Sequence, residues 1–552
     1  MKNEMISYFE DLREQIMHEE KWVKDKFVVF SYEAGSGKSQ NTFRFLAEMT
    51  KQKDYRVLYV QRFVKDDELD NTIDTINNHA GKRVAEGIHS KMSEKDKKKC
   101  IDAQILAISH QMYLQICKGK RKELVKKRDI LIIDEYPDLV EKITLTIKDV
   151  SELWAKSIEN EYLETLATLL RKKWYECKNN SNHGNMQYVN FGEEEFESFK
   201  KTFIQRSDKI AEIIGEPLLD KLQQILSNSC YFYESAFHTF NNQLELYPLK
   251  NNIILDANGS FDYRYRLSSK FNVKKPVKFF DYSTSILQHF TIKTDKTSLN
   301  KQINLTERVF GKISLENKEK TLIITDKDNS EKVRTKASEY LFSFGFSQEE
   351  IDKRISVDYF GNLIGVNSYR DHETVIVLKT PFFDYLSYAL NYLYFQSKYV
   401  KDIGDITIFK NIDVESIRKT VVGGEIYQAI KRINRDNSQS AHMIVCTEYQ
   451  KAVDVVVEQL PKIKYENDSL KVNKVKVDEL PENSTVARVA KAENFLLEQM
   501  EAGIKEVRKK VLRDLVGISD SGNFKRTILK NLTPFFKEHE IEITTNCIIL
   551  NK

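Results

Sequence analysis

The stretch that most constrains the fold of this chain is FVVFSYEAGSGKSQNTFRFL, at residues 27–46. An apolar run is followed by a glycine loop that ends Gly-Lys-Ser, and then by a pattern typical of a helix. Such a loop turns its backbone N–H groups inward around a polyphosphate, and the next helix directs its N-terminus at the negative charge. A bare Gly-Lys-Ser also occurs by chance, but the flanking strand and helix favour a phosphate-binding loop.

The loop predicts ATP and Mg²⁺ as cofactors. Lys38 can reach the β- and γ-phosphates, and the hydroxyl of Ser39 can bind Mg²⁺. Tyr32 stands where the strict pattern has a glycine, so it is either a tolerated divergence or a side chain that packs against the nucleotide. The residues expected to hold the nucleotide are Gly35, Ser36, Gly37, Lys38 and Ser39.

A second motif, Asp-Glu at 134–135, follows the apolar run 130–133. Uninterrupted apolar residues fit a parallel strand that is buried on both faces, and ligands bind at the carboxyl ends of such strands. We therefore expect Asp134 to hold Mg²⁺ and Glu135 to polarise the attacking water as a general base. Alone, an acidic pair could be a solvated strand end. After a phosphate loop, with strands between, it predicts a hydrolysis site.

The order of strand and helix patterns predicts an α/β protein with parallel sheets. Residues 1–145 are expected to form a first α/β domain, which residues 251–300 complete. A helical insertion is expected at 146–250, and a second α/β domain at 301–460. Residues 480–552 read as helix, turn, helix and hairpin, which is either a winged helix or a simple helical cap.

Composition excludes several classes of protein. The chain has 86 Lys and Arg and 82 Asp and Glu, and this small net charge does not by itself indicate a nucleic-acid-binding protein. Any basic track must therefore be local. Six scattered cysteines, with no Cys-x-x-Cys pair, support neither a zinc site nor a disulfide framework. We see no signal peptide and no apolar run long enough to cross a membrane, so a cytoplasmic protein without membrane partners is expected.

The segment 426–435 carries a third group of chemically competent side chains. Gln428, Arg432 and Arg435 are spaced i, i+4 and i+7, which would place them on one helical face. In a cleft between two α/β halves, the two arginines would contact the γ-phosphate as charge develops. Hydrolysis would then open and close the cleft and move a polymer that lies across both halves.

The ordered motifs resemble those of superfamily 2 helicases and translocases. This resemblance implies two tandem RecA-like parallel-sheet domains with a helical insertion and a C-terminal helical or winged-helix-like domain. The insertion resembles the arch of the iron–sulfur helicases, but the four cysteines of those enzymes are missing. Asn258 replaces the customary Thr of motif III, and Lys431 replaces a glycine of motif VI. The matching segments are 33–39 (motif I), 57–61 (Ia), 109–111, 134–137 (II), 255–258 (III), 365–371 (V) and 428–435 (VI).

The same resemblance implies loops that face a nucleic-acid strand and contact its phosphates without reading sequence. The basic run 118–128 is either a phosphate track or a solvated helix end. His110 is either such a contact or a structural hydrogen-bonding residue, and the aromatic helix 382–399 is either core or a stacking platform. The expected strand contacts are Gln61, Arg62, Ser109, His110, Gln111, Asn367 and Arg370.

Three functions fit these motifs. The first is an ATP-dependent helicase or translocase on DNA, or less readily RNA, that works with replication or mobile-element proteins of phage or plasmid type. The second is a nucleotide-switched ATPase of a replication or defence system, which binds DNA or a partner without unwinding. The third, a scaffold that does not hydrolyse ATP, is disfavoured because the catalytic side chains are all present.

Overall fold

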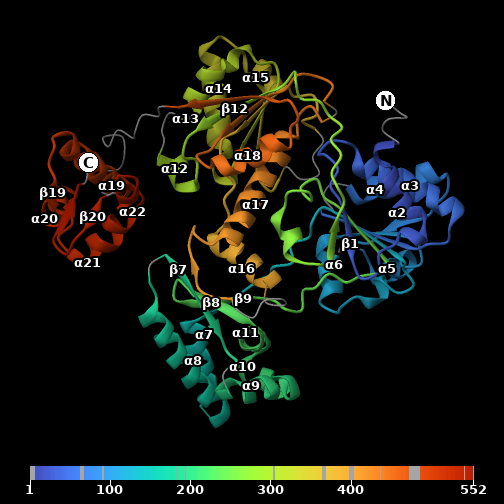
Figure 1. Cartoon of the computed structure of the whole chain (residues 1–552), viewed down its shortest axis with the longest axis horizontal. Helices are drawn as coiled ribbons and strands as arrows, with labels where there is room; N and C mark the ends of the chain where they lie inside the picture. The colour runs from blue at the N-terminus through green and yellow to red at the C-terminus, as the bar shows by residue number, and fades with distance from the viewer. Residues whose placement is uncertain are drawn as a thin grey trace. The chain divides into compact units, whose positions relative to one another are not determined.

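The structure is a computed structural model, and it falls into two compact units. The first is Met1–Asp295 with Ser314–Ser469, and the second is Lys296–Ile313 with Leu470–Lys552 (Figure 1). Within the described part, no helix is both long and apolar enough to pass through a membrane. The residues that the structure describes are 7–62, 68–89, 92–158, 160–182, 184–192, 194–301, 305–362, 368–396, 403–435, 437–470, 485–539 and 541–550.

A seven-stranded parallel sheet carries both acidic and phosphate-loop motifs. Its order is β11-β1-β10-β5-β2-β4-β3, so β10 lies between the phosphate-loop strand β1 and the Asp-Glu strand β5. Alternate residues of β1 enter different hydrophobic clusters on the two faces, which is why its four residues are all buried. The strands are β1 (Phe27–Phe30), β2 (Val57–Gln61), β3 (Ala85–Gly87), β4 (Ile105–Ser109), β5 (Ile130–Asp134), β10 (Asn251–Leu255) and β11 (Phe271–Val273).

Helices that alternate with these strands complete the first domain, as the sequence pattern predicts. They are α2 (Glu10–Met17), α3 (Lys38–Gln52), α4 (Glu68–Ala80), α5 (Glu94–Cys100) and α6 (His110–Cys117).

A six-stranded parallel sheet forms the second α/β domain, in the order β14-β13-β15-β17-β12-β18. Residues 286–291, expected in the first domain, form β12 in this second sheet, because an apolar run does not specify which sheet it joins. Two α/β domains built on parallel sheets are thereby confirmed. The elements are β12 (Ile286–Thr291), β13 (Thr321–Thr325), α14 (Ser330–Ser343), α15 (Gln348–Arg354), β14 (Ile355–Tyr359), β15 (Thr374–Val377), α16 (Tyr385–Gln396), α17 (Ile412–Ile430), β17 (His442–Cys446), α18 (Gln450–Glu458) and β18 (Lys464–Ser469).

The insertion contains strands as well as the expected helices. Its hairpin β8–β9 turns at Glu234 and Ser235, which both have positive φ, as tight hairpin turns require. No Asn-Gly or Asp-Gly marks this turn, so residue types alone do not predict the hairpin. The elements are β6 (Lys142–Thr146), α7 (Ile147–Lys156), α8 (Glu161–Asn180), β7 (Asn185–Asn190), α9 (Glu194–Gln205), α10 (Ser207–Ile214), α11 (Glu216–Ser227), β8 (Ser229–Tyr233) and β9 (Ala236–Phe240).

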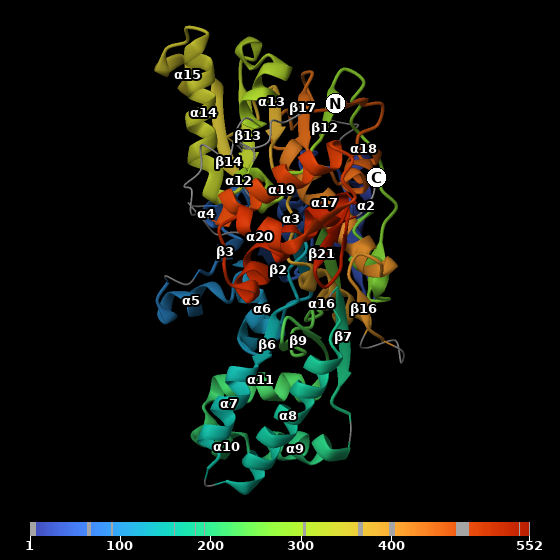
Figure 2. The ribbon, with the colours of Figure 1, turned by 90° about the vertical axis from the view of Figure 1, so that its left-hand side faces the viewer.

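The insertion is hydrogen-bonded to the second α/β domain. Strand β16 (Ile406–Thr407), which precedes α17, pairs antiparallel with β7 and completes a five-stranded sheet. The Tyr188 N–H donates to Asp405 at 2.8 Å, and the Tyr394 hydroxyl of α16 donates to the Leu244 carbonyl at 2.6 Å. The insertion helices gather at one end of the first unit, away from α14 and α15 (Figure 2).

The second unit combines helices with a small antiparallel sheet in the order β19-β21-β20. Its last elements are helices followed by the antiparallel pair β20 and β21. Its elements are α12 (Lys296–Lys301), α13 (Leu305–Ile313), α19 (Thr485–Glu501), β19 (Glu506–Arg508), α20 (Lys509–Leu515), α21 (Ser521–Phe524), a π-helix (Lys525–Leu529), α22 (Lys530–Glu538), β20 (Glu542–Ile543) and β21 (Cys547–Ile549).

The basic run 118–128 ends in a buried residue, so it is not wholly a solvated or phosphate-facing segment. The Arg128 side chain is 5% exposed. Its guanidinium donates to the carbonyls of Val57 at 2.8 Å and Ile101 at 2.7 Å, and so joins β2 to the segment before β4.

We therefore expect Arg128→Met to lower the stability of the first domain by about 2–3 kcal/mol, because it leaves several buried carbonyls without donors. Urea unfolding followed by tryptophan fluorescence measures this change. Lys126→Met, at an exposed position of the same run, is the matched control. Equal unfolding midpoints in the two variants would show that Arg128 has no structural role.

Candidate functional site

The phosphate loop has the geometry that the sequence predicts. Gly35 and Gly37 have φ of 86° and 84°, in the left-handed region that glycine adopts readily. Helix α3 begins at Lys38, directly after Gly37. The first N–H groups of a helix have no partner within it, so the loop presents donors where a phosphate would lie.

One side of this loop touches the second α/β domain. A Cβ atom at Gly35 would lie 2.3 Å from the carbonyl oxygen of Arg435. The Ser36 hydroxyl instead turns back and donates to the Glu33 carbonyl at 2.8 Å. Of the loop residues expected to hold the nucleotide, Ser36 is therefore the one whose side chain does not line the cavity described below.

Ser39 and Asp134 meet at a position suited to Mg²⁺. The Ser39 hydroxyl donates to Asp134 Oδ2 at 2.7 Å, and the Tyr59 hydroxyl donates to the same oxygen at 2.9 Å. Burial raises the pKa of Asp134. A hydroxyl and a carboxylate are hard oxygen donors of the kind that Mg²⁺ takes, with water and phosphate completing its shell. Among the described residues no group of three acidic, His or Cys side chains could hold a metal ion.

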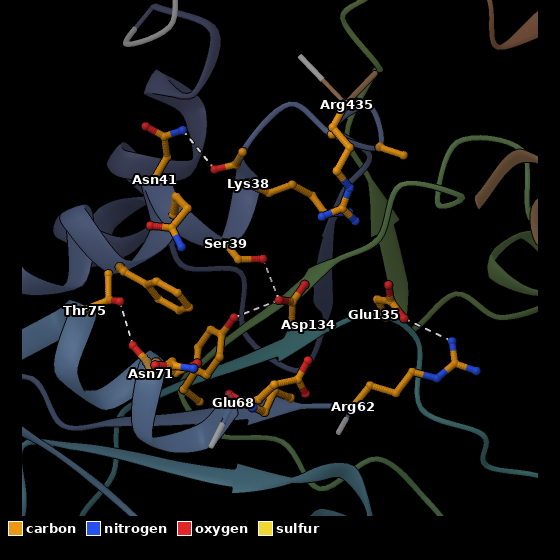
Figure 3. A pocket seen from close by; sticks show the side chains of 18 of the residues that line it. Lys38, Ser39, Asn41, Arg62, Glu68, Asn71, Thr75, Asp134, Glu135 and Arg435 are labelled. Carbon is orange, nitrogen blue, oxygen red and sulfur yellow. Dashed lines mark hydrogen bonds and ion pairs between the residues drawn. The ribbon is translucent and has the colours of Figure 1, made fainter. Parts of the chain in front are cut away.

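Glu135 stands in a strained backbone conformation at the end of β5. Its φ is 69°, and its N–H donates to the Leu255 carbonyl of β10 at 2.9 Å. Its carboxylate forms an ion pair with Arg62, with 3.0 Å between Oε2 and Nη1 (Figure 3). Burial alone would raise the pKa of Glu135, but the charges of Arg62 and Lys38 help to hold it below its ordinary value.

A cavity of about 820 Å³ collects the predicted catalytic residues from both α/β domains. Burial lowers the pKa of Arg432, and burial together with Arg432 lowers the pKa of Arg435 to about 10. The Nε of Arg432 is buried and has no hydrogen-bond partner among the described residues, so its N–H can donate to a ligand. The predicted residues that line this cavity are Gly35, Gly37, Lys38, Ser39, Gln61, Arg62, Asp134, Glu135, Arg370, Gln428, Arg432 and Arg435.

The prediction that the arginines lie on one helical face is wrong. Helix α17 ends at Ile430, and the following residues form turns. Asn434 has a φ of 40° there, and its N–H donates to the Arg370 carbonyl at 3.1 Å. Gln428 therefore reaches the cavity from the last turn of α17, whereas Arg432 and Arg435 reach it from the loop beyond.

The expected strand contacts divide between two cavities. Ser109, His110 and Gln111 line a second cavity of about 650 Å³, also bounded by Tyr388 of α16. Gln61 and Arg370 line the first cavity, of about 820 Å³, and Arg62 lines both. Asn367 lies outside the described residues.

His110 behaves as a structural residue in this arrangement. It is 7% exposed, and its Nε2 is 2.9 Å from the carbonyl oxygen of Asp134. Burial lowers its pKa to about 4, so the imidazole is neutral near pH 7. Ser109 caps α6 by accepting a hydrogen bond from the Met112 N–H at 3.2 Å. His110 therefore supports the strand end at Asp134, whereas Ser109 supports the start of α6.

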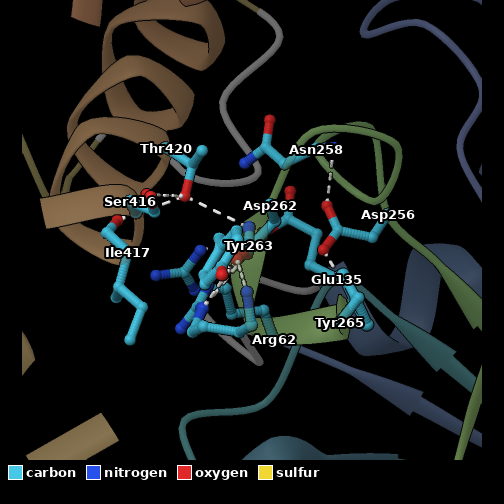
Figure 4. A network of polar contacts seen from close by, with 11 residues as sticks. Arg62, Glu135, Asp256, Asn258, Asp262, Tyr263, Tyr265, Ser416, Ile417 and Thr420 are labelled. Carbon is cyan, nitrogen blue, oxygen red and sulfur yellow. Dashed lines mark hydrogen bonds and ion pairs between the residues drawn. The ribbon is translucent and has the colours of Figure 1, made fainter. Parts of the chain in front are cut away.

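A polar network follows β10, in the motif III segment (Figure 4). Asp256 accepts hydrogen bonds from the Asn258 N–H at 2.8 Å and from the Tyr265 hydroxyl at 2.7 Å. Burial raises the pKa of Asp256. The amide of Asn258 packs against α17, because a Cβ atom at Gly424 would lie 2.9 Å from its Nδ2.

The same network ties the first domain to the start of α17. In the 3₁₀ helix η3 (Tyr263–Leu267), the Tyr263 N–H donates to the Thr420 hydroxyl at 3.1 Å. The Tyr263 hydroxyl donates to Asp413 at 2.6 Å. The sequence does not predict this link, because a tyrosine beside a motif could equally well be a residue of the hydrophobic core.

Tyr32 does not line the first cavity. It is 6% exposed and packs against the rings of Tyr8, Phe9 and Phe30, beneath the phosphate loop. The structure therefore favours the interpretation of Tyr32 as a tolerated departure from the phosphate-loop pattern, and not as a side chain that packs against the nucleotide. Helices α3 and α4 also line the cavity with polar side chains that motif reasoning missed: Arg44, Asn71, Thr72 and Thr75. Asn71 and Thr75 are labelled in Figure 3.

No family model matches this sequence, and no curated protein matches it. Among solved structures, the chain is similar to Xpd4 of S. tokodaii, with 13% identity, a TM-score of 0.48, and 80% of this chain and 96% of that chain covered. It is similar to an apo XPD, with 13% identity, a TM-score of 0.45, and 85% of this chain and 100% of that chain covered. It is similar to S. cerevisiae Dbp5 bound to RNA and ADP BeF3, with 10% identity, a TM-score of 0.37, and 84% of this chain and 92% of that chain covered. The ordered motifs of this chain resemble those of superfamily 2 helicases.

The contact between Gly35 and Arg435 can be tested with Gly35→Ala. The added methyl group meets the Arg435 carbonyl, so we expect the affinity for a non-hydrolysable ATP analogue to fall by about tenfold or more. Gly81→Ala is the matched control, because Gly81 also has a positive φ of 71° but nothing lies within 4 Å of an added Cβ. Isothermal titration of both variants separates the clash from backbone strain, and equal affinities would contradict the contact.

Proposed function

We propose that this protein is an ATP-dependent nucleic-acid helicase or translocase that acts on DNA more readily than on RNA. One observation carries the proposal. A single cavity brings Lys38 and Ser39 of the phosphate loop, the Asp134-Glu135 pair and the arginines beyond α17 together from two α/β domains. A nucleotide there would be held from both sides, as a motor requires.

Each side chain has a role that follows from its position. Lys38 would neutralise the β- and γ-phosphates, while Ser39 and Asp134 would hold Mg²⁺, which supplies charge neutralisation on the phosphates. Glu135 would orient the attacking water and accept its proton. Arg432 and Arg435 would donate to the γ-phosphate as charge develops. Loss of these contacts after hydrolysis would release one domain from the other.

A second candidate is a nucleotide-switched ATPase of a replication or defence system that binds DNA or a partner without unwinding it. The observation that favours it is Asn258 in the motif III segment, whose amide packs closely against Gly424 of α17. Strand displacement measured beside ATP hydrolysis separates the two candidates. Hydrolysis without displacement would support the switch or a translocase that does not unwind.

We expect Lys38→Ala and Glu135→Gln each to reduce nucleic-acid-stimulated ATP turnover by about 10²-fold or more, because each removes a group that acts on the reacting phosphate or water. Turnover should be measured with single-stranded, duplex and forked DNA and RNA. Lys51→Ala, at the exposed end of the same helix α3, is the control. Full turnover in Lys38→Ala would exclude the phosphate loop as the site.

We expect Arg435→Ala to reduce stimulated turnover by about 10²–10³-fold while ATP-analogue affinity changes much less, because an arginine that meets developing charge acts mainly in the transition state. Arg354→Ala, in the same domain but at the end of α15, is the control. If Arg435→Ala retained stimulated turnover, the two-domain site would be wrong even if ATP still bound the loop.

A further inference from the structure

The ion pair between Arg62 and Glu135 follows from the sheet itself. Strands β2 and β5 are parallel neighbours, with Val60 opposite Ile133. Continuing that register by two residues brings Arg62 opposite Glu135, directly beyond the strand ends. The two side chains are 41% and 24% exposed, so the pair lies at the cavity wall rather than in the core.

This pair involves the carboxylate that the proposed reaction needs. The guanidinium of Arg62 donates to Glu135 Oε2, and Figure 3 shows the carboxylate turned toward Arg62. Asp134, by contrast, is turned toward Ser39. A carboxylate that accepts a hydrogen bond from a guanidinium is a poorer acceptor for the proton of water, because its lone pair and its orientation are already committed.

Arg62 is also reachable from the side where a strand is expected. It lines both the first cavity, which is proposed to hold the nucleotide, and the second cavity. Ser109 and Gln111 bound the second cavity. A guanidinium matches the oxygens of a phosphate as well as those of a carboxylate. A backbone phosphate in the second cavity would therefore compete with Glu135 for the same side chain.

We propose that Arg62 is a positioning residue that holds Glu135 away from the attacking water until a backbone phosphate of a bound strand takes over its guanidinium. The inference rests on the proposed function and adds how the strand would switch hydrolysis on. No covalent step is involved: one charge-assisted hydrogen bond is exchanged for another.

The test is ATP turnover with and without single-stranded DNA in Arg62→Gln, Arg62→Lys and Arg83→Gln. Arg62→Gln should raise turnover without DNA by about fivefold, the effect of about 1 kcal/mol, which is the size of a partly exposed ion pair. Its stimulation by DNA should shrink correspondingly. Arg62→Lys keeps the charge and should restore low turnover without DNA. Arg83→Gln breaks an exposed ion pair with Glu86 away from the cavity and should behave as wild type.

A rise in turnover separates this role from a structural one, since a misfolded site would lose activity in both conditions. Fluorescence anisotropy should also show weaker DNA binding by Arg62→Gln. The slope of log affinity against log salt concentration should be smaller by about one, the effect of one lost phosphate contact. If Arg62→Gln has wild-type turnover without DNA but loses stimulation, Arg62 is a strand contact only and the inference fails while the proposed function stands. If the wild-type protein hydrolyses no ATP with any nucleic acid, both fail.

Discussion

The contact between the phosphate loop and the backbone of Arg435 is the constraint on which the rest of the site depends. The N–H groups of the loop must face a phosphate, so its outer side is left to face the second α/β domain. Only glycine permits this at position 35, because φ is positive there and the Arg435 carbonyl occupies the space of a side chain. The loop can therefore present N–H groups to a phosphate on one side while its other side contacts the second domain.

Helix α17 is the element that this contact engages. Its start is tied to the first domain by the hydrogen bond of Tyr263 to Asp413, and the strand β16 that precedes it pairs with β7 of the insertion. Its end leads into the loop of Arg432 and Arg435. A movement of the loop that carries Arg432 and Arg435 would therefore displace α17. Through α17 it would reach the motif III segment and the insertion.

Much of the fold was readable because buried parallel strands leave apolar runs in the sequence, and the loop and acidic motifs stand at their carboxyl ends. The errors have equally specific causes. The regular spacing of Gln428, Arg432 and Arg435 implied a helix, but α17 ends first and turns bring the arginines to the same cavity. The hairpin β8–β9 was missed because its turn, at Glu234 and Ser235, has none of the usual residues.

The sequence by itself determined that residue types suited to phosphate, magnesium and water follow the apolar strands of parallel sheets. Local residue types and spacing are enough for this, because each motif is built within one strand and its following loop. Only the tertiary structure decided the pairings across the chain, such as Arg62 with Glu135, Tyr59 with Asp134 and Gly35 with Arg435. These depend on strand order and on the packing of one domain against another, which no local pattern encodes.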